Sequence, residues 1–412
     1  MFSLKDCWFF NHSGHIIGDF KKMFIIVCIF IISFSNLCFS GISPYYSFEL
    51  SEGIYLPNRG LWGYTTILTN DLGLVYKPAN RHSLFTLFEL RYTGPGLKRR
   101  ESETFEQRSM SNIFMLQYNF NITKEIISKI RLNSTVEYWR TGANEIWTTG
   151  LYDTNNTGGG IELEVNKTGI KAFFGLKYSL LKFPNYTDLL EEYKTGSEEI
   201  STGKQDNNMY QISTGLYYEK NVITFDVIVQ NYLKQYVIEE SGIASKTQLQ
   251  RDISAMVYLN RKESLIENFL DISPFLIFRY KDSNQAYLHF ETFASTTPAY
   301  LPDYYDYIRI SFGLPFNIYF SKTKSLTISP EFEITNYSSR PPRDQNNNII
   351  FNQKQNNNLS IIYFGYNYKP DPSTKTTLFY IFQTQTSNMK FEKYFPYNYS
   401  GKYFGIQFSY SY

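Results

Sequence analysis

The sequence has almost no cysteine and no excess of charge of either sign. Its three cysteines, Cys7, Cys28 and Cys38, all lie within the first 40 of 412 residues. The remaining chain can therefore form neither a disulfide scaffold nor a cysteine-ligated zinc site. Removal of the three lysines and two aspartates in residues 1–40 leaves 37 basic and 36 acidic residues. Because this balance offers nucleic acid no electrostatic attraction, we expect no nucleic-acid partner.

Long apolar runs are also scarce. The one continuous run, residues 24–32, follows Lys21 and Lys22 and lies shortly before Cys38 and Ser40. It is too short to span a membrane, and it has the basic flank and small terminal residues of a secretory signal peptide. We therefore predict that residues 1–40 are a lead-in and cleaved signal peptide. Residues 41–412 would be the exported chain, with Gly41 as its first residue.

Aromatic residues are abundant in a chain that is not hydrophobic on average. There are 36 Tyr and 35 Phe, and aromatics make up 18% of the residues, but the mean hydropathy is only −0.33. Repeated apolar runs of about 20 residues, which a bundle of membrane helices requires, do not occur after residue 40. Apolar residues that alternate with polar ones would account for both observations.

This alternation is clearest in residues 308–320. Ile308, Ile310 and Phe312 share one face of an extended strand with every second residue up to Phe320. Pro315 falls on the other face and predicts a bulge or a strand end there. About 16 strands follow from the same pattern, and residues 281–297 leave 14 or 18 as alternatives. The predicted strands are 46–50, 68–76, 84–92, 114–120, 130–139, 161–165, 170–180, 210–218, 223–232, 249–259, 272–280, 308–320, 326–336, 359–368, 376–382 and 403–412.

The chain ends on an aromatic strand that resembles the terminal strand of bacterial outer-membrane β-barrel proteins. Every second residue back from Tyr412 to Phe404 is apolar, and most are aromatic. The resemblance implies an antiparallel, up-and-down transmembrane barrel in residues 41–412, placed in the outer membrane and in contact with its lipid. It also implies recognition by the barrel-insertion machinery, and it admits a homotrimer. The residues that match the insertion signal are Tyr403, Gly405, Phe408, Tyr410 and the terminal Tyr412.

Short and long connections alternate between the predicted strands. The short ones are 78–81, 121–125, 166–169, 219–221, 321–324 and 370–374, and the long ones are 93–108, 141–157, 184–208, 237–248, 340–357 and 387–400. Transmembrane barrels have short periplasmic turns and long external loops, whereas a soluble β-sandwich has no reason to alternate them. Two sandwich domains are the competing interpretation, but no linker or change of composition divides the chain.

The polar face of such a barrel points into the lumen. Charges on this face either form a constriction that selects ions or pair between neighbouring strands and brace the wall. The predicted lumen-lining charged residues are Glu89, Arg91, Arg131, Glu137, Glu162, Glu164, Lys171, Lys177, Asp226, Asp252, Arg279, Arg309, Glu331 and Glu333. The aromatics predicted to share this face, as a stacking track for sugars or as fillers of the lumen, are Trp139, Phe173, Tyr217, Tyr258, Tyr319, Tyr363 and Tyr403.

Signals of catalysis are poor. No phosphate-binding glycine loop, metal-ligand cluster or nucleophile motif occurs, so we expect no cofactor and no enzyme activity. His289 lies near Glu291, Asp303 and Asp306. The leading hypothesis is therefore a porin-like channel through which small polar solutes diffuse. The alternatives are a barrel that anchors long external loops for adhesion or assembly, and a membrane-embedded hydrolase that uses His289.

Overall fold

The computed structural model describes residues 41–58, 63–94, 108–140, 146–187, 202–290, 299–393 and 396–412. The predicted signal peptide and all three cysteines lie outside these residues. One compact unit, Ser43–Tyr412, contains nearly all of the described chain. Among the described residues, no helix is long and apolar enough to cross a membrane.

The described chain is all-β. Its strands are β1 (Ile42–Pro57), β2 (Gly63–Ala79), β3 (His82–Gly94), β4 (Arg108–Asn121), β5 (Ile126–Arg140), β6 (Thr154–Lys167), β7 (Ile170–Lys182), β8 (Asn207–Tyr218), β9 (Asn221–Ile238), β10 (Ala244–Arg261), β11 (Glu263–Ile266), β12 (Leu270–Ile272), β13 (Phe275–Ser283), β14 (Tyr287–His289), β15 (Ala299–Leu301), β16 (Tyr307–Gly313), β17 (Phe316–Tyr319), β18 (Lys324–Tyr337), β19 (Asn356–Tyr368), β20 (Thr374–Ser387) and β21 (Tyr399–Ser411). Among the strands of the described residues, only β14 and β15 lie outside the main sheet, and they pair with each other.

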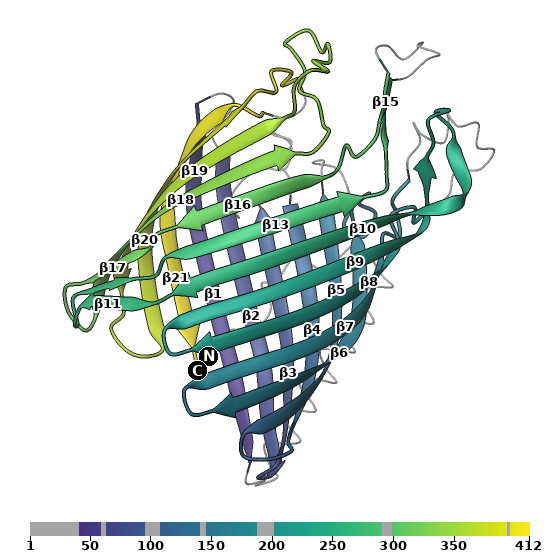
Figure 1. Ribbon diagram of the computed structural model, residues 1–412. Coiled ribbons are helices and arrows are strands. Elements are labelled where there is room, and N and C mark those ends of the chain that lie inside the picture. The colour runs from purple at the N-terminus through teal and green to yellow at the C-terminus, as the bar shows by residue number, and fades with distance from the viewer. Residues whose placement is uncertain are drawn as a thin grey trace. The chain divides into compact units, whose positions relative to one another are not determined.

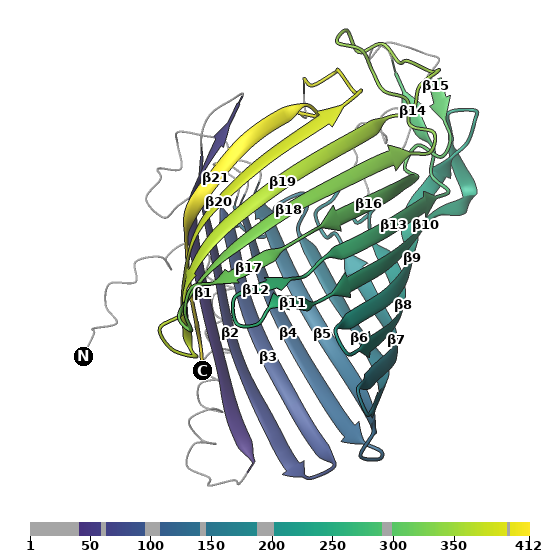
Figure 2. The same ribbon diagram turned by 60° about the vertical axis from the view of Figure 1, so that its left-hand side comes forward.

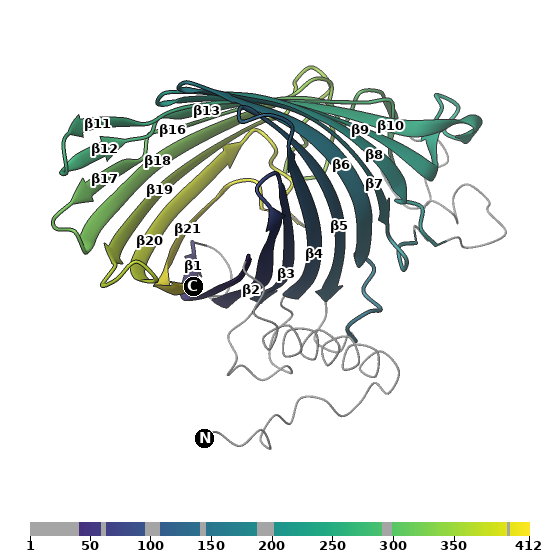
Figure 3. The same ribbon diagram turned by 90° about the horizontal axis from the view of Figure 1, so that it is seen from below.

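The main sheet closes on itself as a barrel of sixteen antiparallel strands, counted over the described residues. Each strand pairs with the next along the chain, and β1 pairs with β21 from Ser47 opposite Ser411 to Pro57 opposite Gly401. The strands are strongly inclined in the wall (Figure 1), and β1 and β21 lie side by side where the ring closes (Figure 3). The predicted barrel and its strand number are thus confirmed.

Three of the sixteen strands are interrupted. β10 continues as β11 beyond Lys262, β12 and β13 are separated by Ser273 and Pro274, and β16 and β17 by Leu314 and Pro315. Proline has no backbone N–H to donate, so it ends a run of strand pairing. The strand end predicted at Pro315 is therefore present, and Pro274 causes a second one on the neighbouring strand.

The side chains are distributed inside-out relative to a soluble protein. Among the described residues, six apolar and twenty polar or charged residues are buried. Large apolar side chains are instead exposed on the outer face, such as Leu132 at 52%, Phe332 at 51% and Leu378 at 54%. Water-soluble proteins do not expose apolar surface on this scale, whereas a barrel in hydrocarbon requires it.

The two ends of the barrel differ in the length of the connections between strands. Two- to five-residue turns connect the strands at the end where the chain terminates, and Tyr46 and Tyr412 exchange backbone hydrogen bonds of 3.1 and 2.8 Å there. We call this the short-turn end, and the opposite one the loop end. The loop end carries longer connections, including residues 284–306, 338–355 and 388–398, and β14 and β15 stand beyond the wall there (Figure 2). The predicted alternation of connection lengths is present with one exception.

The exception is the connection between β9 and β10. The prediction of a long loop at residues 237–248 was wrong. β9 runs to Ile238 and β10 begins at Ala244, so only residues 239–243 connect them. The register shifts between Ala244 and Leu249 and again before Arg251. Such bulges break the period of two that identifies a strand in the sequence. Residues 281–297, which fitted no single strand, both extend β13 to Ser283 and contribute β14.

Candidate functional site

The inward face of the barrel carries the polar residues of each strand. In β16, Arg309 alternates with Ile308 and Ile310, whose outward side chains are 38% and 43% exposed. The same alternation places all fourteen predicted lumen-lining charged residues on the inward face. Their contacts show which charged side chains form ion pairs or hydrogen bonds with neighbouring side chains and which do not.

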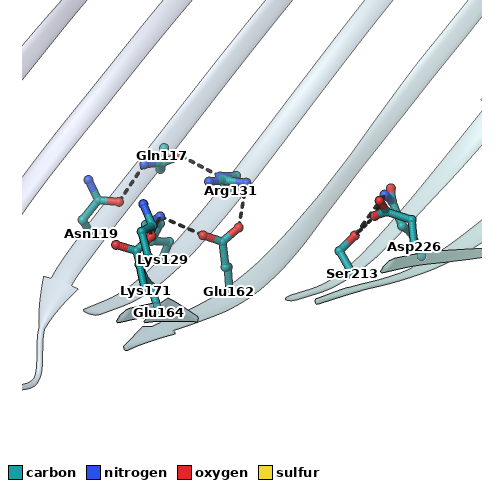
Figure 4. Close-up of polar contacts among 10 residues, drawn as sticks. Gln117, Asn119, Lys129, Arg131, Glu162, Glu164, Lys171, Ser213 and Asp226 are labelled. Carbon is teal, nitrogen blue, oxygen red and sulfur yellow. Dashed lines mark hydrogen bonds and ion pairs between the residues drawn. The ribbon is translucent and has the colours of Figure 1, made fainter. Parts of the chain in front are cut away.

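The largest charged cluster lies on β5, β6 and β7, and we call it the β5–β7 cluster: Lys129, Arg131, Glu162, Glu164 and Lys171 (Figure 4). Lys129 Nζ lies 2.7 Å from Glu162 Oε1 and 2.6 Å from Glu164 Oε2. Arg131 Nη1 lies 3.0 Å from Glu162 Oε2, and Lys171 Nζ lies 3.0 Å from Glu164 Oε2. Three positive groups thus surround two carboxylates.

Strand register brings these groups together. Lys129 is directly opposite Glu162 in the β5–β6 pair, and Asn166 is opposite Lys171 in the β6–β7 pair. The side chain of Glu164 is only 6% exposed, so its charge depends on its two lysine partners. Sequence reasoning missed Lys129 because the predicted strand began at residue 130, whereas β5 begins at Ile126.

Amide side chains support the β5–β7 cluster. Arg131 Nε donates to Gln117 Oε1 at 2.6 Å, and Gln117 Nε2 donates to Asn119 Oδ1 at 2.7 Å. Asn166 Nδ2 donates to Glu164 Oε1 at 2.8 Å. These bonds join β4 to the three charged strands, so the network spans four neighbouring strands and lies along the wall.

A second cluster surrounds Asp252 of β10, which is only 1% exposed. Its carboxylate lies 2.9 Å from Lys281 Nζ and accepts a hydrogen bond of 2.6 Å from Ser283 Oγ, both on β13. Tyr232 of β9 donates to the same group at 3.4 Å. Lys281 was also missed, because the predicted strand ended at residue 280. On the strand pair β8–β9, Asp226 accepts a bond of 2.5 Å from Ser213 (Figure 4).

A third group lies on β16 and β18. Arg309 Nε is 3.3 Å from Glu333 Oε1 and donates to Thr335 Oγ1 at 3.0 Å. Glu333 also accepts a 3.0 Å bond from Ser311. Elsewhere on the inward face, Glu89 pairs with Arg91 of its own strand at 2.7 Å, and Glu331 accepts a 3.1 Å bond from Ser329.

Five of the predicted charges have no ion pair among the described residues: Glu137, Lys177, Asp226, Arg279 and Glu331. Arg279 is directly opposite Arg309 in the β13–β16 register. Lys177 and Arg131 are both opposite Gly160, one from each neighbouring strand. The inward face therefore combines paired charges, which brace the wall, with a few positive groups that are not neutralised by a neighbour.

Inward aromatic rings lie across glycines instead of standing away from the wall. A Cβ placed on Gly215 would be 2.2 Å from the ring of Phe173, and one on Gly53 would be 2.4 Å from the ring of Tyr403. Rings of Phe275, Tyr363, Tyr55 and Phe379 approach Gly313, Gly365, Gly401 and Gly405 in the same way. The missing side chain provides the space in which each ring lies.

The aromatics predicted to form one stacking track therefore make several separate contacts. Phe173, Tyr363 and Tyr403 cover glycines, and Tyr217 packs near Phe173 with ring centroids 6.2 Å apart. The centroids of the Tyr258 and Phe275 rings are 6.4 Å apart. Tyr319 donates to Asp271 at 3.1 Å, close to the short-turn end. No contact joins Trp139 to this set within the described residues.

The terminal strand completes the barrel wall. Phe408 and Tyr410 lie on the outward face opposite Leu50 and Phe48 of β1, whereas Tyr403 and Gly405 lie on the inward face. Gly405 is directly opposite Gly53, and the rings of Phe379 and Tyr403 cover this pair of glycines. Tyr412 is 72% exposed at the short-turn end. Recognition of these residues by an insertion machinery remains a prediction.

His289 lies in β14, opposite Ala299 of β15, and is 5% exposed. Glu291, one of its predicted neighbours, lies outside the described residues. Asp306 accepts the backbone N–H of Ser283 at 2.8 Å. Within the described part of the chain, no group of three or more His, Cys, Asp or Glu side chains could hold a metal ion.

The comparisons with known proteins bear on the fold. No family model and no curated protein matches the chain. Among solved structures, the chain is similar to OmpT, an outer membrane protein of Vibrio cholerae, with 10% identity and a TM-score of 0.50 over 91% of this chain and 99% of that one. It is also similar to the anion-selective porin from Comamonas acidovorans, with 9% identity and a TM-score of 0.47 over 90% of this chain and 100% of that one.

The closed barrel, the inside-out distribution of side chains and the similarity to OmpT define the class: the chain has the fold of bacterial outer-membrane β-barrel proteins. The fold supports a place in the outer membrane. The predicted signal peptide lies outside the described residues and remains a prediction.

Proposed function

We propose that the protein is an outer-membrane channel through which small polar solutes diffuse passively. Strand number is the first support, since a barrel of about 16 strands is the size at which an aqueous lumen fits inside the wall. The short-turn end would face the periplasm and the loop end the exterior, as in other barrels of this kind.

The observation that carries this proposal is the direction in which the inward side chains lie. Charged groups of the β5–β7 cluster bond to neighbours in the same wall, and rings such as Phe173 lie across a glycine of the next strand. Side chains held along the wall would leave the space near the axis to water. The same polar groups would hydrate a passing solute.

The proposal can be tested by liposome swelling. The mature chain, refolded and shown to be heat-modifiable on a gel, is inserted into vesicles that are transferred to solutions of neutral sugars of increasing size. We expect rapid swelling with the smallest sugars and a size cut-off. Vesicles with the same protein after boiling are the control. A folded barrel that admits no sugar contradicts the proposal.

One alternative has a structural observation in its favour. The loop end carries a pocket formed by three connections, which suits a protein whose barrel presents loops for binding. In that case the folded barrel would bind a ligand at its loops but would let no solute pass. The hydrolase alternative predicts an activity that His289→Ala abolishes. The partners of the protein remain predictions: the insertion machinery, the membrane lipid and other copies of the chain in a homotrimer.

A further inference from the structure

Three connections at the loop end meet around a pocket of about 290 Å³. Tyr287 and Tyr304 come from the connection between β13 and β16, Arg340 from that between β18 and β19, and Tyr397 from that between β20 and β21. None of these residues takes part in the inward charged clusters. The pocket is therefore a feature separate from the proposed channel.

Backbone hydrogen bonds hold the three connections together. Ser338 N donates to the carbonyl of Asp306 at 2.9 Å, and Lys390 N donates to that of Arg343 at 2.8 Å. The connection between β18 and β19 is thus tied to both of its neighbours. Gln355 N also closes this connection on itself through the carbonyl of Arg340, at 2.7 Å. A pocket built on such bonds is formed before a ligand arrives, which reduces the entropic cost of binding.

Two arginines and three tyrosines at the pocket are joined by a chain of ring contacts. The guanidinium carbon of Arg340 lies 4.7 Å from the ring centre of Tyr304 and 4.8 Å from that of Tyr337. Tyr304 stacks on Tyr287 with centroids 4.3 Å apart and planes at 19°. Arg343 lies 5.9 Å from the ring centre of Tyr287. A guanidinium that stacks on a ring keeps its N–H groups at its edges, where they can donate hydrogen bonds.

The two guanidinium charges are not neutralised by an acid. Within the described residues, neither forms an ion pair with a carboxylate, and their hydrogen-bond partners are neutral: Tyr397 and Tyr304 for Arg340, and Asn347 and Tyr287 for Arg343. Nε of Arg340 is buried without a partner. Burial raises the pKa of Tyr304, so its hydroxyl stays neutral. A buried donor and two uncompensated positive charges favour an anionic ligand.

We infer that this pocket binds an acidic sugar, meaning a sugar ring that carries a carboxylate or a phosphate. Guanidinium edges recognise both acid groups by paired N–H donors, and a sugar ring packs its C–H faces on tyrosine rings. The volume suits one or two sugar units. A free sugar acid and an acidic unit of a surface glycan share this chemistry. The inference goes beyond the proposed channel and does not depend on it.

Calorimetric titration of the folded, full-length mature barrel with glucuronic acid, glucose 6-phosphate and glucose tests the inference. We expect the carboxylate, the phosphate or both to bind, and glucose to bind at least about tenfold more weakly, because it lacks the charged acceptor. Arg343→Gln should weaken binding of the acid about tenfold, and Arg340→Gln/Arg343→Gln should abolish it. Arg251→Gln, an exposed arginine on β10, should leave it unchanged.

The outcomes separate the possibilities. Binding of only one acid assigns the preferred group, and competition by an acidic oligosaccharide identifies a surface glycan as the source. Where the double variant fails to show the gel mobility of the folded barrel, the single Arg343→Gln variant decides. Equal binding of glucose, no binding of either acid, or unchanged binding by folded Arg343→Gln overturns the inference.

Discussion

At the scale of single residues, the inward glycines matter because of what lies over them. Gly215 and Phe173 belong to neighbouring strands, and the phenyl ring occupies the place of the missing side chain. Ring and glycine therefore act as one unit of the wall. The Phe173–Gly215 pair joins β7 and β8 through packing in addition to the ladder of backbone hydrogen bonds.

Gly215→Ala should destabilise the barrel by about 1–3 kcal/mol, since the new Cβ would lie 2.2 Å from Phe173 Cε1 and force the ring away. Urea titration of the refolded barrel in lipid vesicles measures this change. Gly175→Ala is the matched control, because its Cβ would have no neighbour closer than 3.6 Å. Equal effects of the two substitutions would show that packing over Gly215 is unimportant.

A second residue-scale prediction concerns Asp306, in the connection before β16. Burial raises the pKa of this carboxyl, despite the opposing effect of the hydrogen bond from the Ser283 backbone N–H. Since the folded state binds the proton more readily than the unfolded state, the ionised group costs stability above the raised pKa. This cost disappears as pH falls below the usual Asp pKa of about 3.9.

Asp306→Asn should therefore raise the melting temperature at pH 8 and have little effect at pH 3. Asparagine Oδ1 can still accept the Ser283 amide, so the geometry is preserved. Thermal melting followed by gel mobility gives both values. Glu240→Gln, in the exposed turn between β9 and β10, is the control with the same loss of charge. A lower melting temperature for Asp306→Asn at pH 8 would refute this explanation.

At the scale of elements, the β5–β7 cluster joins three strands, and Lys129 makes the link from β5 to β6. Lys129 bonds to both Glu162 and Glu164. Lys129→Met should cost about 1–3 kcal/mol, because two poorly exposed carboxylates lose a common cation. Urea titration at low and high salt measures this loss of unfolding free energy. Lys124→Met, in the exposed turn before β5, should be neutral; if both variants behave alike, the cluster does not brace the wall.

The elements were largely predictable from the sequence because membrane strands need a strict period of two. Residues 308–320 and 403–412 show this period without a break on the apolar face. Strand ends were harder, since polar residues next to a connection can belong either to the strand or to the connection. Lys129 and Lys281 were missed for this reason alone. Bulges near Leu249 concealed the start of β10 in the sequence, so the connection between β9 and β10 was predicted to be too long.

The pocket at the loop end could not be predicted from the sequence. Tyr287, Arg340 and Tyr397 belong to three connections, and no periodicity links them. Only the closed barrel determines which connections are neighbours. The bracing of charges was foreseen as an alternative, but which charge meets which depends on strand register, as the Lys129–Glu162 pair shows.

At the scale of the whole molecule, the inward charges should determine ion preference. Arg279 is opposite Arg309 and has no ion pair within the described residues. Arg279→Glu should therefore shift the reversal potential under a salt gradient towards cations. Lys322→Glu, in an exposed short turn, is the control with the same change of charge. An unchanged reversal potential would place Arg279 outside the path of ions.

The central claim is that the barrel conducts. Single-channel recording of the refolded mature chain in a planar bilayer tests it most directly, and gel mobility shows beforehand that the protein is folded. We predict stable open steps whose conductance rises in proportion to salt concentration, as expected for diffusion through a hydrated lumen. A correctly folded and inserted barrel that gives no steps would contradict the channel function and leave the binding loops as the functional part.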